Sequence, residues 1–316
     1  MKYEGQICRA PMERGAYMLP VMVGCSYGRC RFCNLFRHLK YRELPLEDIR
    51  ADLKRVKEAG GHPKRVFLGD GNAFGLKTEK LIAILDLIHS FFPDVEEINM
   101  DATITAIKHK SDEELKRLRD KKVCHLYIGI ESALDDVLAF MEKDHNNTEA
   151  LEEITRLKRF GYIYDAHIMT GVAGTGRGQE NAEALAAWIN KTRPAHVVNF
   201  SMFLHREVPL YQDMEEGKFA PASEYETLSE ERELINRITV PIRYEGFHDY
   251  IAFRVRGRLP EEKEKMLSKM DKAILHYKDR RSVYAFVKGE CPNLIKCESD
   301  EEIWNMENII EKKRKL

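Results

Sequence analysis

Residues 17–33, with the sequence YMLPVMVGCSYGRCRFC, give the clearest indication of the fold class of this chain. The run from 17 to 24 is apolar and has the length of a buried strand. Three cysteines follow at once in the spacing Cys-x4-Cys-x2-Cys, and they are Cys25, Cys30 and Cys33. Gly24 and Gly28 let the loop wrap tightly around a bound group. Active sites of barrel folds lie after the carboxyl ends of strands, so this loop is the first candidate site.

The order of an apolar strand followed by an amphipathic helix is repeated up to residue 240. Further strands are predicted at residues 65–70, 95–101, 125–130, 162–170 and 197–204. Helices are predicted between them, and Ser111 with Glu114 forms a capping-box pattern that opens one of them. Six strand–helix units in strict alternation indicate a parallel sheet with helical crossovers. A closed barrel usually needs roughly 250 residues. We therefore predict an α/β fold, an open partial (βα)6 TIM-like barrel, with a doubly wound Rossmann-like sheet as the rival.

The pattern divides the chain into three segments. Residues 1–16 are a lead-in, residues 17–240 are the (βα)6 core, and residues 241–316 form a small C-terminal α+β extension. In the extension a stretch rich in aromatic residues and arginine precedes a predicted helix from Pro260 to about His276. A strand-like segment at 282–287 and a polar C-terminal helix follow.

Composition narrows the classes of function. The chain has 316 residues with 51 Lys plus Arg and 52 Asp plus Glu, a net charge of −1. This balance disfavours a globally basic nucleic-acid binder, although a local basic patch stays open. No stretch approaches the roughly 18 apolar residues of a membrane span, and the first 15 residues lack the apolar core of a signal peptide. We therefore expect a cytoplasmic location and no membrane partner.

In a reducing compartment, clustered cysteines indicate metal or redox chemistry instead of disulfides. Three thiols suit a cubane iron–sulfur cluster with one iron open to an exchangeable ligand, because a purely electron-carrying cluster normally has four protein ligands. Arg29 and Arg31 would favour the thiolate forms. The alternative is zinc, since His38 could complete a tetrahedral Cys3His set. The remaining cysteines are Cys124, expected in the core, and Cys8, Cys291 and Cys297, which could join around an auxiliary cluster.

The cysteine loop and the six units resemble the radical S-adenosylmethionine (SAM) superfamily over most of residues 10–240. The usual loop of that family is Cys-x3-Cys-x2-Cys with an aromatic residue before the last cysteine. Phe32 matches the aromatic residue, whereas the first spacing is one residue longer here. The resemblance implies that Cys25, Cys30 and Cys33 hold a [4Fe-4S] cluster whose open iron binds SAM. It implies reductive cleavage of SAM to methionine and a 5′-deoxyadenosyl radical, which abstracts hydrogen from an unidentified substrate.

Later strand ends carry further motifs similar to those of the family, and the motif after the fourth strand, Glu131-Ser132, is similar to that of one branch. That branch holds oxygen-independent coproporphyrinogen oxidases, methylthiotransferases and the Elongator catalytic subunit. By the resemblance, the motifs receive the SAM amino group, its methionyl or ribose part and its adenine. The motif for the SAM amino group is Gly69-Asp70-Gly71, where the family more often has Gly-Gly-Glu. The motif for the methionyl or ribose part is Glu131-Ser132. The motif for the adenine runs from His167 to Gly174 and includes Thr170 and Gly171. Each also has a plain structural interpretation, as a turn, a helix cap or a flexible loop.

Candidate substrate contacts lie in two places. His205 and Arg206 follow the sixth strand, and Arg254 and Arg256 lie in the extension. On a strand the latter two would share one face, with Phe253 and Val255 on the other. This face could bind an anionic or nucleotide substrate, or it could be the solvated side of a half-buried strand.

The resemblance also implies partners. We expect an external electron donor of the flavodoxin or ferredoxin kind and a small-molecule or cofactor-precursor substrate, with nucleic acid left open. The alternative from a different class is a non-catalytic iron–sulfur carrier or a binding protein stabilised by zinc. Formation of 5′-deoxyadenosine separates these hypotheses, because a carrier or zinc protein should not produce it.

Overall fold

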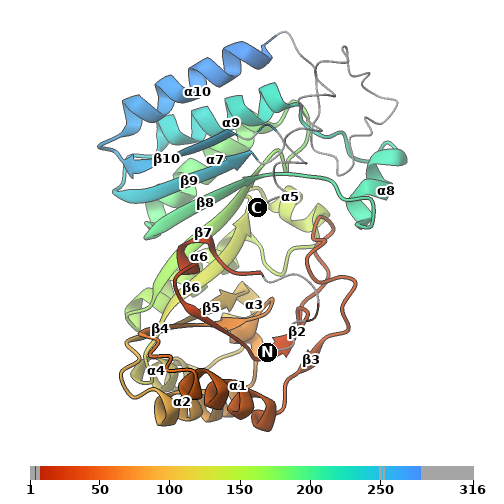
Figure 1. Cartoon of the computed structure of the whole chain (residues 1–316). Helices are drawn as coiled ribbons and strands as arrows, with labels where there is room; N and C mark the ends of the chain where they lie inside the picture. Colours follow the sequence, from red (N-terminus) through yellow and green to blue (C-terminus); the bar gives the residue numbers. More distant parts are fainter. Residues whose placement is uncertain (1–3, 5–7, 249–250, 252, 279–316) are drawn as a thin grey trace. The chain divides into compact units, whose positions relative to one another are not determined.

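The computed structural model describes residues 4, 8–248, 251 and 253–278, which form two compact units (Figure 1). The first unit contains the chain up to Gly129 together with Lys143–Asp165. The second contains Ile130–Glu142 and the chain from Ala166 onward. The predicted strand at 282–287, the C-terminal helix, Cys291 and Cys297 lie outside the described residues.

The first unit is built on four strands in the order β1-β4-β5-β6, each parallel to its neighbour. Its strands are β1 (Tyr17–Pro20), β2 (Met22–Val23), β3 (Arg42–Glu43), β4 (Arg65–Gly69), β5 (Glu97–Ala102) and β6 (Val123–Glu131). Its helices are η1 (Pro11–Glu13), α1 (Leu46–Glu58), η2 (Ala73–Gly75), α2 (Thr78–Phe91), α3 (Ile104–Lys108), α4 (Asp112–Asp120) and α6 (Asn147–Arg159). The capping box predicted for α4 is confirmed: Ser111 Oγ accepts from Glu114 N, and Glu114 Oε2 accepts from Ser111 N.

The run predicted as a single strand at residues 17–24 is divided in the structure. β1 pairs with β4, whereas β2 leaves that ladder and pairs antiparallel with β3. Pro20 has no N–H and cannot extend a ladder as a donor. Val21 N still donates to Gly69 O at 2.5 Å, and the chain then turns away. The cysteine loop therefore runs between β2 and β3 and is closed at its base by this two-stranded ribbon.

The lead-in packs on the strands of the first unit. The Glu13 side chain is buried and accepts hydrogen bonds from Asn99 Nδ2 at 2.7 Å and from Tyr127 OH. Ala10 and Ala16 belong to the same buried cluster as Met18, Phe67 and Tyr127. Both hydrogen bonds go to Glu13 Oε1 and hold residues 8–16 on the strands, whereas Glu13 Oε2 is buried without a hydrogen-bond partner among the described residues.

The second unit contains strands in the order β7-β8-β9-β10. They are β7 (Ile163–Thr170), β8 (His196–Ser201), β9 (Ile242–His248) and β10 (Phe253–Leu259). Its helices are α5 (Asp135–Phe140), α7 (Gly178–Thr192), α8 (Pro209–Glu215), α9 (Glu224–Arg237) and α10 (Lys263–Tyr277). β9 is parallel to β8 and antiparallel to β10, and α9 packs against both α7 and α10.

The strand pairing confirms the predicted fold class. Parallel strands alternate with helices, as the α/β prediction requires. Among the described strands, β1 pairs only with β4 and β10 only with β9, so the sheet has two free edges and does not close. The short helices α3, α5 and α8 were not predicted, because each is too brief to show a helical period.

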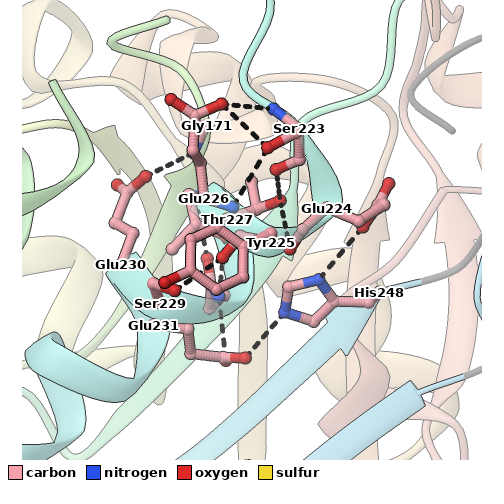
Figure 2. Close-up of polar contacts among 12 residues, drawn as sticks. Gly171, Ser223, Glu224, Tyr225, Glu226, Thr227, Ser229, Glu230, Glu231 and His248 are labelled. Carbon is pink, nitrogen blue, oxygen red and sulfur yellow. Dashed lines mark hydrogen bonds and ion pairs between the residues drawn. The ribbon is translucent and has the colours of Figure 1, made fainter. Parts of the chain in front are cut away.

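A buried polar cluster joins α9 to His248 of β9 (Figure 2) and to Asn199 of β8. Glu231 Oε2 contacts His248 Nε2 at 2.7 Å, and Glu231 Oε1 accepts from Tyr244 OH and Asn199 Nδ2, each at 2.9 Å. A Cβ on Gly246 would lie 1.8 Å from Glu231 Oε1, so only glycine fits there. The neighbouring Glu230 accepts from Gly171 N at 2.8 Å and from Asn181 Nδ2 at 2.6 Å.

This cluster makes stability depend on pH. Burial alone would lower the pKa of His248, but the charges of Glu231 and Glu224 raise it to about 9, so its stabilising contribution is present below about pH 6.5 and is lost toward pH 9. Burial raises the pKa of Glu230 to about 8, so the native state keeps a proton that the unfolded chain releases above about pH 4.5. Both terms lower stability as the pH rises. We expect the free energy of unfolding to fall by about 5 kcal/mol between pH 6 and pH 9 in urea titrations, with roughly half of the fall from each group.

Glu230→Gln is the control for this prediction, since its neutral amide mimics the protonated carboxyl. The variant should show a flatter pH profile over the same interval. Stability that is constant or rises toward pH 9 would contradict the assignment of a charged His248.

Candidate active site

The cysteine loop, residues 24–41, carries three half-buried thiols. Each of the five cysteines in the described part of the chain is a free thiol. Gly24 and Gly28 have φ of +77° and +62°, so the glycines predicted to let the loop wrap do adopt the left-handed conformation. Cys33 N donates to Cys30 O at 3.2 Å, which makes a tight turn between the last two cysteines. The loop thus holds its cysteines by backbone turns.

The Gly69-Asp70-Gly71 turn after β4 packs directly on this loop. A Cβ on Gly71 would lie 2.7 Å from Gly24 O and 2.8 Å from Cys25 Cα. Asn72, which is buried, donates from Nδ2 to Ser26 Oγ at 3.0 Å and to Thr103 Oγ1 at 3.2 Å. Its Oδ1 accepts from Thr103 N at 3.1 Å. Asn72 therefore joins the cysteine loop to the ends of β4 and β5, a role that no sequence motif indicated.

Two carboxyl groups stand at these strand ends. Asp70 is 3% exposed, and its Oδ1 has no hydrogen-bond partner among the described residues. Burial raises the pKa of Asp70 to about 6. Burial, and then the charges of Asp70 and Glu13, raise the pKa of Asp101 to about 8. Buried carboxylates without a matching cation suit a positively charged ligand group. The sequence predicted Asp70 for this region, whereas Asp101 at the end of β5 was missed.

A buried cation stands at the same site. The side chain of Lys143 is 6% exposed, and its Nζ lies 3.9 Å from Asp144 Oδ1. Burial raises the pKa of Cys33; backbone hydrogen bonds from Leu35 and Phe36 oppose the rise, and the charge of Lys143 opposes it to a smaller extent. Arg29, predicted to favour the thiolates, has its Cζ over the Tyr27 ring, 5.1 Å from the ring centroid. Lys143 was missed because it lies in the segment before α6, far along the sequence from the cysteines.

The Asp144 carboxylate is fixed by contacts to both of its oxygens. Its Oδ2 accepts from Thr105 N at 2.8 Å, and its Oδ1 contacts His145 Nδ1 at 3.1 Å. Burial alone would raise the pKa of Asp144, but the hydrogen bond from His145 and the charge of Lys143 hold it well below its usual range. The Lys143–Asp144 pair is thus anchored to α3, which begins directly after Thr103.

The remaining predicted cofactor residues lie in the second unit, where buried partners hold several of them. Ser132 Oγ donates to Asn181 Oδ1 at 2.6 Å and accepts from Leu134 N. Thr170 N donates to Asn199 Oδ1 at 3.0 Å. Both side chains are buried. These contacts give Ser132 and Thr170 a structural role, and their role toward a cofactor stays a prediction.

Three other predicted residues of this group differ in their surroundings. Glu131 is half-buried and has a φ of +61°. Gly171, with a φ of +82°, would bring a Cβ within 2.7 Å of Thr227 Cγ2. His167 is half-buried, and its ring meets Phe200 edge-on with 5.9 Å between centroids. Glu131 and His167 are thus the members of this group that keep partly exposed side chains.

The predicted substrate residues occupy two separate segments. His205 and Arg206 follow β8, and the His205 side chain is 25% exposed, with its Nδ1 3.8 Å from Glu207 Oε2. Arg254 and Arg256 are exposed on β10. Phe32, the aromatic residue of the cysteine loop, is half-buried. The binding of a substrate by His205, Arg206, Arg254 and Arg256 stays a prediction.

A cavity of about 420 Å³ lies beside the loop at residues 172–177 in the second unit. Phe140 and Phe219 line it and stack with 6.1 Å between ring centroids. Arg177 and Asp136, also in the lining, form an ion pair at 2.6 Å. Because these two charges satisfy each other, the cavity offers mainly ring and backbone surface.

The three thiols of the cysteine loop are the number that holds a cubane cluster with one iron left open. The zinc alternative needs a fourth ligand, for which the sequence offers His38. Gly71 packs against Cys25, so the cysteine loop has no room for a side chain at position 71.

Comparison with known proteins agrees with this reading of the loop. The model of the radical SAM superfamily matches residues 19–189, and the chain belongs to that superfamily. The resemblance predicted from the motifs is thereby confirmed at the level of the superfamily. Enzymes of this family use a [4Fe-4S] cluster and SAM.

Individual relatives are distant. Heme chaperone HemW of Buchnera aphidicola subsp. Schizaphis graminum is 20% identical over 193 residues, 58% of this chain and 50% of that protein. Coproporphyrinogen III oxidase HemN from Escherichia coli has 13% identity and a TM-score of 0.52, covering 70% of this chain and 51% of that one. Methylornithine synthase PylB has 17% identity and a TM-score of 0.51, covering 71% and 63%. The structural likenesses show the fold, and the chain spans about half the length of the first curated relative.

Within residues 8–248 and 253–278, no helix is both long and apolar enough to cross a bilayer.

Proposed function

We propose that this chain is a radical SAM enzyme in which Cys25, Cys30 and Cys33 hold a [4Fe-4S] cluster. The observation that carries the proposal is the cysteine loop packed on the Gly69-Asp70-Gly71 turn within the matched family region. When bound, the cluster and SAM supply reductive cleavage of the sulfonium to methionine and a 5′-deoxyadenosyl radical, with one electron from an external donor. The donor is of the flavodoxin or ferredoxin kind.

The chain's own residues would orient SAM by its amino-acid end. Asp70 and Asp101 present carboxyl groups that lack a matching cation, so they suit the ammonium group of SAM. Lys143 presents a buried cation near Cys33, so it suits the SAM carboxylate. Asn72 fixes the loop and the two strand ends relative to one another. Together these residues would hold the amino-acid end of SAM by charge complementarity.

The test is formation of 5′-deoxyadenosine by anaerobically reconstituted protein with dithionite and SAM. We expect the product from the native chain, in the presence of candidate small-molecule substrates where needed. One relative is named a heme chaperone, so the assay must separate catalysis from binding. An intact cluster that binds SAM but gives no product with any substrate would support the carrier hypothesis instead. Bound zinc without iron would overturn the proposal.

Lys143→Gln gives a residue-level prediction. A charge-assisted contact to a carboxylate is worth about 1.5–3 kcal/mol, so the KM for SAM should rise about tenfold or more. The cluster content should stay that of the native protein. Initial rates of 5′-deoxyadenosine formation against SAM concentration measure the effect.

The matched control is Lys54→Gln, which removes an exposed lysine of α1 in the same unit. It should leave the KM unchanged. Two results would contradict the assignment of Lys143 to the SAM carboxylate. One is a KM for SAM in Lys143→Gln that equals the native value. The other is a loss of iron without a rise in that KM.

A further inference from the structure

A series of buried hydrogen bonds joins the residues that follow β6 and β7 in the second unit. Ser132 Oγ donates to Asn181 Oδ1 at 2.6 Å, and Asn181 Nδ2 donates to Glu230 Oε1 at 2.6 Å. Glu230 Oε2 in turn accepts from Gly171 N at 2.8 Å. All four residues are buried. We call this series of contacts the Asn181 bridge.

At its first end the Asn181 bridge fixes a strained turn. Glu131 has a φ of +61°, a left-handed conformation that is unfavourable for a residue with a side chain. Ser132 N donates to Ile130 O at 2.8 Å, so the chain makes a three-residue turn around Glu131. Ser132 Oγ also accepts from Leu134 N at 3.1 Å. Strained backbone of this kind persists only where its surroundings hold it, and it is concentrated at functional sites.

At its second end the bridge holds the loop at residues 171–178 against α9. Glu230 binds the start of the loop through Gly171 N. Four residues earlier on the same helix, Glu226 Oε1 accepts from Thr175 Oγ1 at 2.7 Å and from Gly176 N at 2.8 Å. Residues four apart lie on one face of a helix, so a single face of α9 fixes the loop at two points.

We propose that Asn181 and Glu230 are positioning residues for SAM. Glu131 and Gly171 belong to the motifs that resemble those for the methionyl or ribose part and for the adenine. Asn181 and Glu230 are 0% and 2% exposed, so they act through these two strand ends and not by contact with SAM. Their bridge would keep the two motifs in the relative arrangement that one SAM molecule requires. The inference rests on the proposed function, because it assumes that the chain binds SAM.

Asn181→Ala tests this role, because it removes both hydrogen bonds at the middle of the bridge. We expect the reconstituted variant to bind SAM about tenfold more weakly than the native chain, with unchanged iron and sulfide content. Equilibrium dialysis with radiolabelled SAM measures the dissociation constant on the anaerobic protein without a reductant, so turnover is not needed. Ser132→Ala breaks the bridge at its first end and should weaken SAM binding in the same way if Asn181→Ala does not fold.

The matched control is Asn190→Ala. Asn190 lies on the same helix, α7, where its Nδ2 donates to Arg237 O and its Oδ1 accepts from Thr239 N, each at 2.9 Å. It therefore also joins α7 to the end of α9, but nine residues beyond Asn181, about 13 Å along the helix. Its loss should lower stability and change the dissociation constant for SAM less than twofold.

Glu230→Gln is the conservative variant. Its amide oxygen can accept from Gly171 N, and its amide nitrogen can donate to Asn181 once the Asn181 amide turns over and donates to Ser132 Oγ. The bridge is thereby kept without the charge. We expect Glu230→Gln to bind SAM within about threefold of the native chain, whereas a role that depends on the charge alone would make it as weak as Asn181→Ala.

Three results would overturn the inference while the native chain still binds SAM. One is an equal dissociation constant for SAM in Asn181→Ala and the native chain. Another is an equal loss of affinity in Asn181→Ala and Asn190→Ala, which would show a general effect of lost stability. The third is a loss of iron in Asn181→Ala that accounts for the lost SAM binding. Absence of SAM binding by the native chain would instead contradict the proposed function, and this inference would fail with it.

Discussion

Reconstituted Cys30→Ala protein is expected to hold no stable [4Fe-4S] cluster and to form no 5′-deoxyadenosine. Cys25, Cys30 and Cys33 would be all of the protein's ligands, so removal of one leaves a second iron without a protein ligand. Mutation of outer-shell partners already costs about 10–100-fold in metal affinity or activity, and loss of a direct ligand should exceed that. Iron and sulfide content, visible absorbance and product yield measure the effect.

The matched control is Cys124→Ala. Cys124 is a half-buried thiol in β6 whose Sγ accepts from Arg119 Nη1 at 3.3 Å, away from the cysteine loop. This variant should keep the native iron content and product yield. If Cys30→Ala retains both, then the cluster is not held by this loop, and the proposed function fails with it.

The second large effect is expected at Glu231, whose buried carboxylate contacts His248 (Figure 2) and accepts hydrogen bonds from Tyr244 and Asn199. Glu231→Gln keeps the shape but removes the charge that faces His248. Breaking a buried pair from one side costs about 3–5 kcal/mol, because the other charge stays buried without a partner. We expect a loss of this size in the free energy of unfolding at pH 6, measured by urea titration.

Glu233→Gln is the control on the same helix. Glu233 forms a surface ion pair with Arg237, and such pairs contribute about 0–1 kcal/mol. A double variant with His248→Gln should recover part of the loss, since the unpaired charge is then removed. Equal losses of unfolding free energy in Glu231→Gln and Glu233→Gln would show that the buried pair contributes no more to stability than the surface pair.

Features that depend on local spacing could be predicted from the amino-acid sequence. The cysteine loop is contiguous, so the residue types and their intervals indicated the cluster directly. Periodic apolar residues indicated the alternation of strands and helices, and the Ser111–Glu114 pair indicated the start of α4. The period of two along β10 also predicted correctly that Arg254 and Arg256 share a face.

Which distant residues meet follows only from the folded chain. Lys143 and Asn72 carry no motif and reach the cysteine loop from the segment before α6 and from the end of β4. Asp101 carries no motif either and acts on Asp70 and Cys8 from the end of β5. The Glu231–His248 pair is likewise invisible in the sequence, since α9 and β9 come together only by packing. Spacing along a chain fixes local geometry, whereas long-range contacts are chosen by burial and charge compensation in the folded state. That is why the cluster loop was predicted and the groups around it were not.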